Sequence, residues 1–480
     1  MNVLGRIDAR GDATALLLGV GLTAAVIAAT TRYGAPLAVG TVVVLALFVG
    51  STVCFLLAPH VAVAATIPLF AAIPMVKVLA FYWAGPVKDA VTLSAALATA
   101  LYVLQREGRK TLEHTDKLVL VAVGGLAFLY LLNVGGLTGE SWHGEAWLHG
   151  VRLTAEPLLL LLAGLLLPYS HRTLQWAATS LVASGCVVAA YGVLQQFVGI
   201  GWLTEIGYTF GDQVDTFGSQ LRSFGTLDDA FAYAVFLFLA LATTIFWMRR
   251  SVLSWACGGL IAAGIVVAFV QTAAVVGSAL LALWLVRAGR TAAGVILFAA
   301  TLATGVALTI AAAPATESKT VQAGPSTYVT LNGRTTAWAT IFEDGSKIPL
   351  GQGVGAVGRA SLRANIGITS VSGTPGHSKV GETAVDSGYL AAVADVGLAG
   401  LAVLLLLLGR LVTLAGRATR LPGVVAGWLC LGYLTVLLLD ALTRDSFTGF
   451  PTAYLGFLLV GTSLAVVREQ DRLHRAVPAP

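Results

Sequence analysis

Two arginines, one aspartate and one histidine stand in polar segments between long apolar runs of the sequence. Arg222 and Arg334 each carry a planar guanidinium, a group that holds phosphate through two parallel hydrogen bonds. Asp386 comes directly before an apolar run, where an aspartate followed by a serine ordinarily caps a helix. His377 is the best histidine candidate for a base, although an ordinary loop position explains it better. Arg222 has a plain alternative too, as an interfacial arginine that extends to lipid phosphates.

The segment around Arg334 has more features of a binding loop. Residues 331–341 have helical periodicity, which places Arg334 on a face that would rest on the membrane and aim the guanidinium inward. The stretch Pro-Leu-Gly-Gln-Gly-Val-Gly at 349–355, with Gly353 as its middle glycine, allows a close backbone turn or is a plain loop. Arg363, four residues after another arginine, belongs to a basic stripe that faces either an anion or solvent.

The composition indicates what kind of protein must position these residues. Of 480 residues, 57% are hydrophobic and only 11% are charged, whereas soluble domains carry about 25% charged residues. A soluble enzyme, a disordered chain and a disulfide scaffold are therefore excluded. The net charge of +5 is too small and scattered for nucleic-acid binding, and the four cysteines lie in apolar runs without metal-ligand spacing. The sequence predicts an all-α polytopic membrane protein.

Apolar runs of about 20 residues, the length that spans a bilayer, recur along the chain and predict about 12 to 14 transmembrane helices. The runs are approximately 13–31, 36–58, 61–84, 87–105, 118–135, 153–169, 174–200, 227–248, 253–271, 273–287, 291–313, 388–409, 423–442 and 450–467. The least distinct are 61–84, which contains a lysine and two prolines, and the adjacent pair 253–271 and 273–287.

The basic residues of the short loops predict the orientation. With the N-terminus in the cytoplasm, the basic clusters at 106–117, 249–250 and 410–420 lie inside, as the positive-inside rule requires. Both chain ends are then expected in the cytoplasm.

This orientation leaves three outer segments too long to be turns, at about 136–152, 201–226 and 314–387. The expected organisation is a bundle of about 11 helices over 1–313, a large extracytoplasmic catalytic loop over 314–387, and about three helices over 388–480. Loops of this length are commonly functional, so the chemistry is expected on the outer face.

Four stretches between about 185 and 400 together resemble the O-antigen ligase and polymerase superfamily of bacterial inner-membrane glycosyltransferases. They are Tyr191-Gly192-Val193-Leu194-Gln195, Arg222-Ser223-Phe224-Gly225-Thr226-Leu227, Arg334 to Trp338 with Pro349 to Gly355, and Asp386-Ser387-Gly388-Tyr389-Leu390 with Asp395 to Gly400. The corresponding family patterns include Tyr-Gly-x-x-Gln, Arg-x-x-Gly-Thr-Phe, Arg-x-x-x-Trp and Pro-Leu-x-Gly-x-Gly. The resemblance implies a GT-C-like fold of transmembrane helices with one large extracytoplasmic loop.

The sequence departs from the family at two informative places. The family's Thr-x-Ser-Arg-Gly stretch has neither serine nor arginine here, at 272–277, and Arg152 is the candidate replacement for that arginine. The position that is histidine in ligases is Asp386, and an acidic residue there is more typical of polysaccharide polymerases.

The resemblance also implies a chemistry. Arg222 and Arg334 would bind the diphosphate of a polyprenyl-diphosphate-linked donor, and Asp386 would take the proton of the acceptor sugar hydroxyl. Transfer would invert the anomeric configuration, without a metal or a cofactor. The residues expected to contact the substrates are Arg152, Arg363, Gly353, Tyr389 and His377.

The predicted function is polymerisation of lipid-linked oligosaccharide repeats at the outer face of the cytoplasmic membrane. Its partners would be the glycan donor, the glycan acceptor and the lipid bilayer, with a flippase and a chain-length regulator beside it. A ligase that transfers the finished glycan to another acceptor is the alternative within the family. A lipid-linked sugar transporter and a non-catalytic scaffold are alternatives from other classes. A transporter needs charges near the midplane, for which Lys77, Glu156, Asp395 and Asp440 are the candidates.

Overall fold

The computed structural model is almost entirely helical over the residues that it describes, which are 35–79, 85–132, 144–210, 214–217, 220–248, 251–270, 272–312, 349–355, 387–421 and 424–476. The helices are α2 (Ala35–Leu57), α3 (Pro59–Leu79), α4 (Gly85–Leu104), α5 (Arg106–His114), α6 (Lys117–Leu132), α8 (Gly144–Leu166), α9 (His171–Glu205), α10 (Ala230–Phe246), α11 (Val252–Val267), α12 (Thr272–Arg287), α13 (Thr291–Ala312), α16 (Gly388–Ala418), α17 (Val425–Asp440) and α18 (Thr452–Ala476). The strands β1 (Asp215–Phe217) and β2 (Gln220–Arg222) pair as one antiparallel hairpin.

Seven of the described helices, α2, α3, α4, α8, α9, α16 and α18, are long and apolar enough to cross a membrane. The pair α5 and α6 adds an eighth span if the bent pair counts as one. The apolar helices α10, α11, α12 and α17 have 16 or 17 residues, and such a helix is only about 25 Å long. The prediction of an all-α polytopic membrane protein is therefore confirmed. Helix length supports seven or eight full crossings among the described residues, fewer than the 12 to 14 expected.

The helix boundaries differ from the predicted runs where glycines and polar residues break or extend them. α9 is kinked at Gly199 (φ 74°) and α16 at Gly397 (φ 70°), positive angles that glycine adopts without strain. α8 begins at Gly144, so part of the predicted outer loop 136–152 is helical. The predicted loop 106–117 contains α5, which meets α6 at 96°. Of the predicted loop 314–387, only 349–355 and Ser387 are described.

Two glycines allow the close packing of the C-terminal part of α8 against α18. A Cβ atom at Gly164 would lie 2.6 Å from the Leu458 carbonyl oxygen, and one at Gly461 would lie 2.6 Å from the Leu161 carbonyl oxygen. The two backbones thus approach as closely as small residues permit between membrane helices. The same two helices carry Glu156 and Tyr454, which are joined by a hydrogen bond in a network of charged residues described below.

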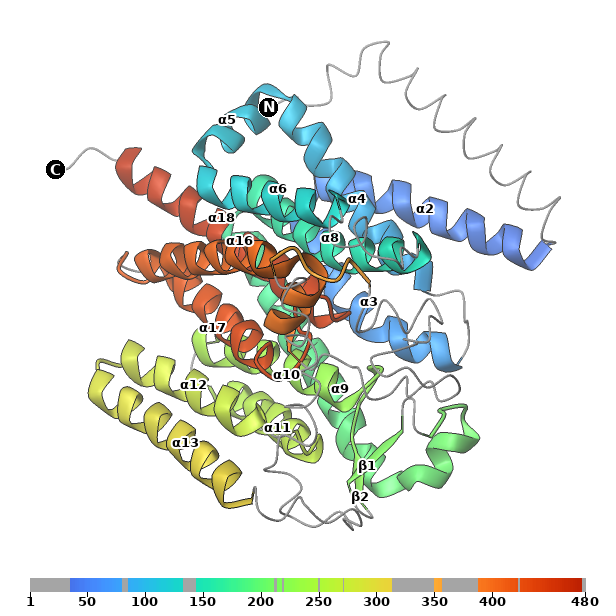
Figure 1. Ribbon diagram of the computed structural model, residues 1–480. Coiled ribbons are helices and arrows are strands. Elements are labelled where there is room, and N and C mark those ends of the chain that lie inside the picture. The colour runs from blue at the N-terminus through green and yellow to red at the C-terminus, as the bar shows by residue number, and fades with distance from the viewer. Residues whose placement is uncertain are drawn as a thin grey trace.

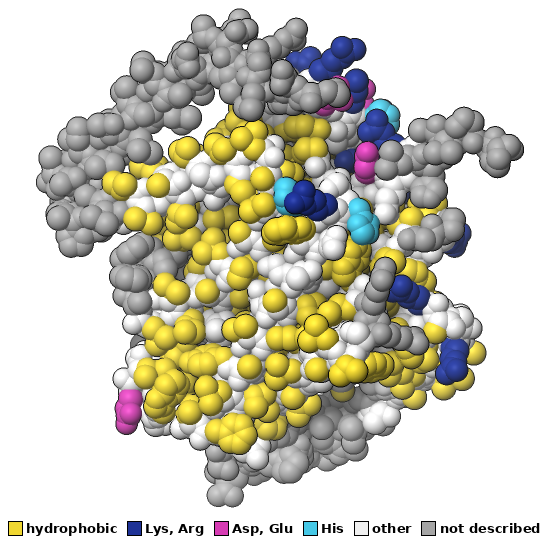
Figure 2. Space-filling model, turned by 180° about the vertical axis from the view of Figure 1, so that it is seen from behind, with side chains coloured by type: hydrophobic (Ala, Val, Ile, Leu, Met, Phe, Trp, Pro, Cys, Tyr) yellow, Lys and Arg dark blue, Asp and Glu magenta, His cyan; other side chains and the backbone are white. Residues whose placement is uncertain are grey.

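The surface of the bundle is suited to lipid. Figure 2 shows many hydrophobic side chains over the middle and lower part of one face, with few charged side chains among them. In Figure 1, α5 and the C-terminal end of α18 lie at one end of the bundle, and the β1–β2 hairpin lies at the opposite end. The fold therefore separates α5, which lies in the predicted cytoplasmic cluster 106–117, from the hairpin, which lies in the predicted outer segment 201–226.

The orientation of the two ends can be tested by cysteine labelling. In a variant whose four native cysteines are replaced by alanine, a single cysteine at Glu205 should react with an impermeant thiol reagent added outside intact cells. A single cysteine at Lys110 should react only after the cells are opened. Both side chains are exposed, so the reverse pattern would overturn the orientation.

Candidate functional site

The backbone around Arg222 is fixed by a buried glutamine of α9. The Gln195 Oε1 accepts hydrogen bonds from the Phe224 N–H (3.1 Å) and the Gly225 N–H (2.9 Å), and its Nε2 donates to the Gly225 carbonyl oxygen (2.9 Å). The stretches 191–195 and 222–227, which both carry the family resemblance, are thus in direct contact. Gly225 has φ 57° and lies against the Tyr233 ring, which leaves no space for a Cβ atom.

The three hydrogen bonds of the Gln195 side chain predict a measurable loss of thermal stability when they are removed. The change Gln195→Leu would leave two buried N–H groups and one carbonyl without partners, at a cost of about 1–3 kcal/mol for each group. We expect a clear drop in the thermal unfolding temperature of the detergent-purified protein. The matched control is Gln175→Leu, because Gln175 is exposed on the same helix. Equal unfolding temperatures of the two variants would contradict this role of the Gln195 hydrogen bonds.

Arg222 closes the β1–β2 hairpin and reaches the first turn of α10. Its Nη1 donates to the Asp215 Oδ2 at 3.2 Å, across the register that pairs these two residues. Its guanidinium carbon lies 5.7 Å from the centre of the Phe231 ring. The side chain is 17% exposed. Arg222 is therefore a cation held over an aromatic face and still reached by solvent.

A second arginine, Arg444, lies against the same ring from the turn between α17 and α18. Its guanidinium carbon is 5.8 Å from the centre of the Phe231 ring, and its Nη2 donates to the Asp229 Oδ2 at 2.9 Å. The side chain is only 8% exposed. Its Nη1 is buried and has no hydrogen-bond partner among the described residues. A buried guanidinium nitrogen without an acceptor is a group prepared for an anion.

Asp229 connects Arg444 to α10. It is the N-cap of α10, since its Oδ1 accepts the Ala232 N–H at 2.6 Å while its Oδ2 accepts from Arg444. Asp229 thus joins the start of α10 to the turn that contains Arg444.

The N-terminus of α16 rests on the same turn as Arg444. The Gly388 N–H donates to the carbonyl oxygens of Ala441 (2.9 Å) and Arg444 (2.8 Å). Ser387 is the N-cap of α16, and its Oγ accepts the Leu390 N–H. The capping role considered for Asp386 therefore belongs to Ser387. Asp386 lies outside the described residues, but its chain neighbour is fixed beside the Arg444 backbone.

Tyr389 follows this cap and faces α17. Its hydroxyl donates to the Leu438 carbonyl oxygen at 3.1 Å, and its ring packs edge-on against Phe447 at 5.3 Å. In this arrangement Tyr389 holds the start of α16 against α17. Its expected contact with substrate stays a prediction.

The glycine-rich stretch 349–355 packs into the break of α16. The Gln352 N–H donates to the Ala394 carbonyl oxygen (2.7 Å), and the Gly355 N–H donates to the Asp395 Oδ1 (3.2 Å). A Cβ atom at Gly351 would lie 2.6 Å from the Asp395 carbonyl oxygen. The alternating glycines thus permit a close approach of two backbones, and Gly353 (φ 111°) lies within it. The segment is thus a turn that packs closely against α16, and a substrate contact at Gly353 stays a prediction.

Arg152 lies in a separate network of charges between α4 and α8. It bonds to both oxygens of Asp89, and its Nε is 3.2 Å from the Glu156 Oε1. Lys88 is 2.5 Å from the Glu156 Oε2, which also accepts the Tyr454 hydroxyl at 2.6 Å. The Arg152 side chain is 32% exposed, and the two carboxylates that it contacts balance its charge together with that of Lys88. Its role as a substrate-binding replacement stays a prediction.

The structure describes some of the predicted site residues and not the others. Arg222, Tyr389, Gly353 and Arg152 are described, and contacts link Arg222 and the start of α16 through Phe231 and Arg444. Arg334, Arg363, His377 and Asp386 lie outside the described residues. Over the described ranges, no group of three His, Cys, Asp or Glu side chains is arranged to hold a metal ion.

Sequence reasoning missed Arg444. The only signal was a charged pair, Arg444 and Asp445, in a short turn between two apolar runs. No family model and no curated protein matches the chain. The interpretation of the site therefore depends on its geometry and on the residue patterns.

Proposed function

We propose that the protein is a membrane glycosyltransferase that polymerises polyprenyl-diphosphate-linked oligosaccharide repeats on the outer face of the cytoplasmic membrane. One observation carries the proposal: Arg222 and Arg444 converge on the Phe231 ring beside the N-terminus of α16. Two guanidiniums at the end of an apolar bundle suit a diphosphate whose prenyl chain remains in the bilayer. A GT-C-like arrangement of helices, with a large outer loop, belongs to the same proposal.

The reaction proposed for this site is a single displacement. The acceptor hydroxyl oxygen attacks the anomeric carbon, the bond from that carbon to the diphosphate oxygen breaks, and the configuration inverts. The hydroxyl proton passes to Asp386, and the electron pair leaves with the prenyl diphosphate. Charge develops on the leaving diphosphate, so donors placed beforehand around it stabilise the transition state most. Arg222, Arg334 and Arg444 are the proposed donors.

The surroundings of Arg444 support this role. A buried cation normally has its donors satisfied, because desolvation of an unpaired group is costly. Asp229 neutralises Arg444 on one side only, through Nη2. The phosphate oxygens of the donor substrate would satisfy the Nη1, which has no partner among the described residues.

Transport is supported less well by the charges within the bundle. Glu156 is paired with Lys88 and Arg152, Asp395 accepts the Gly355 N–H, and Asp440 accepts the Ser446 hydroxyl. These interactions hold helices and loops together, so the acidic groups already have partners within the protein. The ligase alternative uses the same donor and the same arginines, and differs in the acceptor.

The lipid-linked glycans of a deletion strain distinguish the alternatives. For a polymerase, we expect the long glycan ladder to collapse to single repeats on the lipid carrier. A ligase instead leaves complete long chains stranded on the carrier. Unchanged glycans would overturn both enzymatic proposals. Purified protein should extend a lipid-linked repeat in the presence of EDTA, and loss of turnover on chelation would overturn the metal-independent mechanism.

A further inference from the structure

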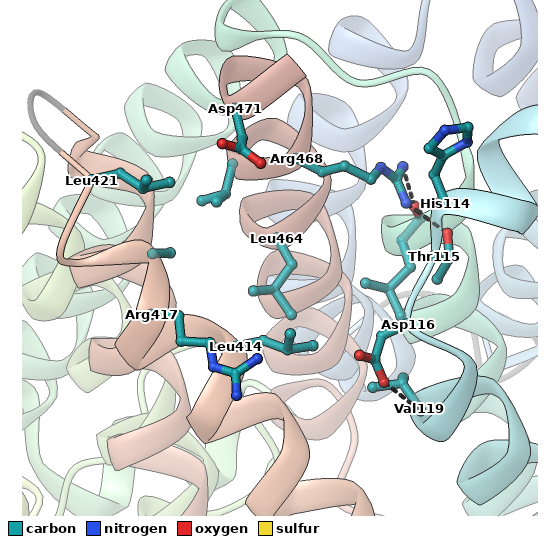
Figure 3. A pocket seen from close by; sticks show the side chains of 13 residues that line it. His114, Thr115, Asp116, Val119, Leu414, Arg417, Leu421, Leu464, Arg468 and Asp471 are labelled. Carbon is teal, nitrogen blue, oxygen red and sulfur yellow. Dashed lines mark hydrogen bonds between the residues drawn. The ribbon is translucent and has the colours of Figure 1, made fainter. Parts of the chain in front are cut away.

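A cavity of about 400 Å³ lies at the end of the bundle opposite the β1–β2 hairpin. In Figure 3, His114, Thr115 and Asp116 line it from the break between α5 and α6, Leu414 and Arg417 from α16, and Leu464 and Arg468 from α18. These elements form the predicted cytoplasmic side. The cavity is therefore remote from the proposed catalytic site and does not depend on it.

The inner walls of the cavity are mostly aliphatic. Its apolar lining residues include Val119, Leu165, Leu414, Leu421, Leu464 and Val467. Aliphatic walls that open at the end of membrane helices suit an acyl chain better than a hydrated solute.

Two arginines add positive charge to these walls. Arg468 donates from its Nη1 to the Thr115 hydroxyl (2.6 Å) and from its Nη2 to the Leu165 carbonyl oxygen (2.9 Å), so its guanidinium is fixed in place. Arg417 is exposed, and its side chain makes no hydrogen bond or ion pair with the described residues. Arg417 is thus the cation free to bind an incoming anion.

The acidic residues of the lining do not cancel this charge. Asp116 is held by Arg410, whose Nε lies 3.1 Å from both carboxylate oxygens and whose Nη2 lies 2.5 Å from Oδ2. The hydrogen bonds from Arg410 keep the pKa of Asp116 below its ordinary value, so this pair is a neutral unit. Asp471 remains as one carboxylate against Arg417 and Arg468, with His114 also in the lining.

We propose that this cavity binds an anionic phospholipid of the cytoplasmic leaflet, with its phosphate at Arg417 and the start of an acyl chain along Leu414 and Leu464. A basic pocket between helices at this side of a membrane is a recurring form of headgroup recognition. The volume is sufficient for the headgroup and the first part of one chain. The bound lipid would connect α16 and α18 to the break between α5 and α6.

Lipid binding to the full-length, detergent-purified protein tests the proposal. With native mass spectrometry as the readout, phosphatidylglycerol should bind more tightly than phosphatidylcholine. Arg417→Gln should weaken phosphatidylglycerol binding by about fivefold to tenfold, the effect of one arginine near a membrane phosphate. The matched control is Arg420→Gln, since Arg420 is also exposed on this side but does not line the cavity.

A second variant tests the cavity itself without a change of charge. Leu414→Trp should fill the apolar wall and weaken the binding of phosphatidylglycerol, whereas Leu406→Trp on the exposed surface of the same helix should not. Equal losses in Arg417→Gln and Arg420→Gln would show diffuse attraction and overturn the site. Inorganic phosphate that binds as tightly as phosphatidylglycerol would overturn the choice of a lipid.

Discussion

Arg444→Lys should lower turnover of a lipid-linked donor by about 10²–10³-fold, the usual effect of removing one donor to a transition-state charge. Lysine keeps the positive charge, and it should keep an ion pair with Asp229. It lacks the planar fork that lets one side chain bond to Asp229 and to a phosphate oxygen together. The measurement is turnover by purified protein at matched expression. Arg222→Lys is expected to have a similar effect, because Arg222 lies against the same ring.

The control for these variants is Arg420→Lys, which changes an exposed arginine at the other end of the bundle. It should leave turnover unchanged. All variants should insert and purify alike, since the Arg444 backbone carbonyl, which holds Gly388, is not altered. Full turnover of both Arg222→Lys and Arg444→Lys would contradict the diphosphate role of the pair.

Several helices were predictable because a long apolar run satisfies its backbone hydrogen bonds in a bilayer only as a helix. The run 36–58 corresponds to α2 (Ala35–Leu57), and the run 291–313 corresponds to α13 (Thr291–Ala312). Their breaks were harder to predict. Gly397 interrupts α16 because the backbone of Pro349 approaches it, with only 2.3 Å from a Cβ position to the Pro349 carbonyl oxygen. That approach joins segments nearly fifty residues apart, so no local pattern contains it.

The candidate site was predictable in its local features but not in its tertiary ones. The Asp229 cap and the position of Arg222 before α10 follow from sequence neighbours. Arg444 comes from a turn that is distant in the chain, and its packing on Phe231 depends on how α17 and α18 meet α10. The same holds for Arg152. Its partner Glu156 is one helical turn away, whereas Asp89 and Lys88 come from α4.

The site also changes what a mutation at Asp386 would mean. By its sequence position alone, Asp386 could cap α16, so that loss of activity in such a variant would reflect a lost cap. Ser387 now accounts for the cap of α16, through its Oγ and the Leu390 N–H. Ser387→Ala should therefore lower stability by about 1 kcal/mol, measured by thermal unfolding, with little effect on turnover.

Asp386→Asn should reduce turnover by about 10²–10⁴-fold, the usual contribution of a positioned base. The amide is nearly the size of the carboxylate but does not accept a proton, so folding and donor binding should be retained. Turnover and binding of the lipid-linked donor are measured on the same preparation. Asp386→Glu keeps a carboxylate and should retain more activity than Asp386→Asn, if the longer side chain still reaches the acceptor hydroxyl.

His377 is the rival base, and the matched experiment is His377→Ala at equal expression. If Asp386 accepts the proton, His377→Ala should turn over at close to the unaltered rate. An active Asp386→Asn protein beside an inactive His377→Ala protein would move the base to the histidine. Because Ser387→Ala measures the cost of a lost cap, a defect in Asp386→Asn without loss of stability has only a chemical explanation. That combination would distinguish proton transfer at Asp386 from any structural role at the start of α16.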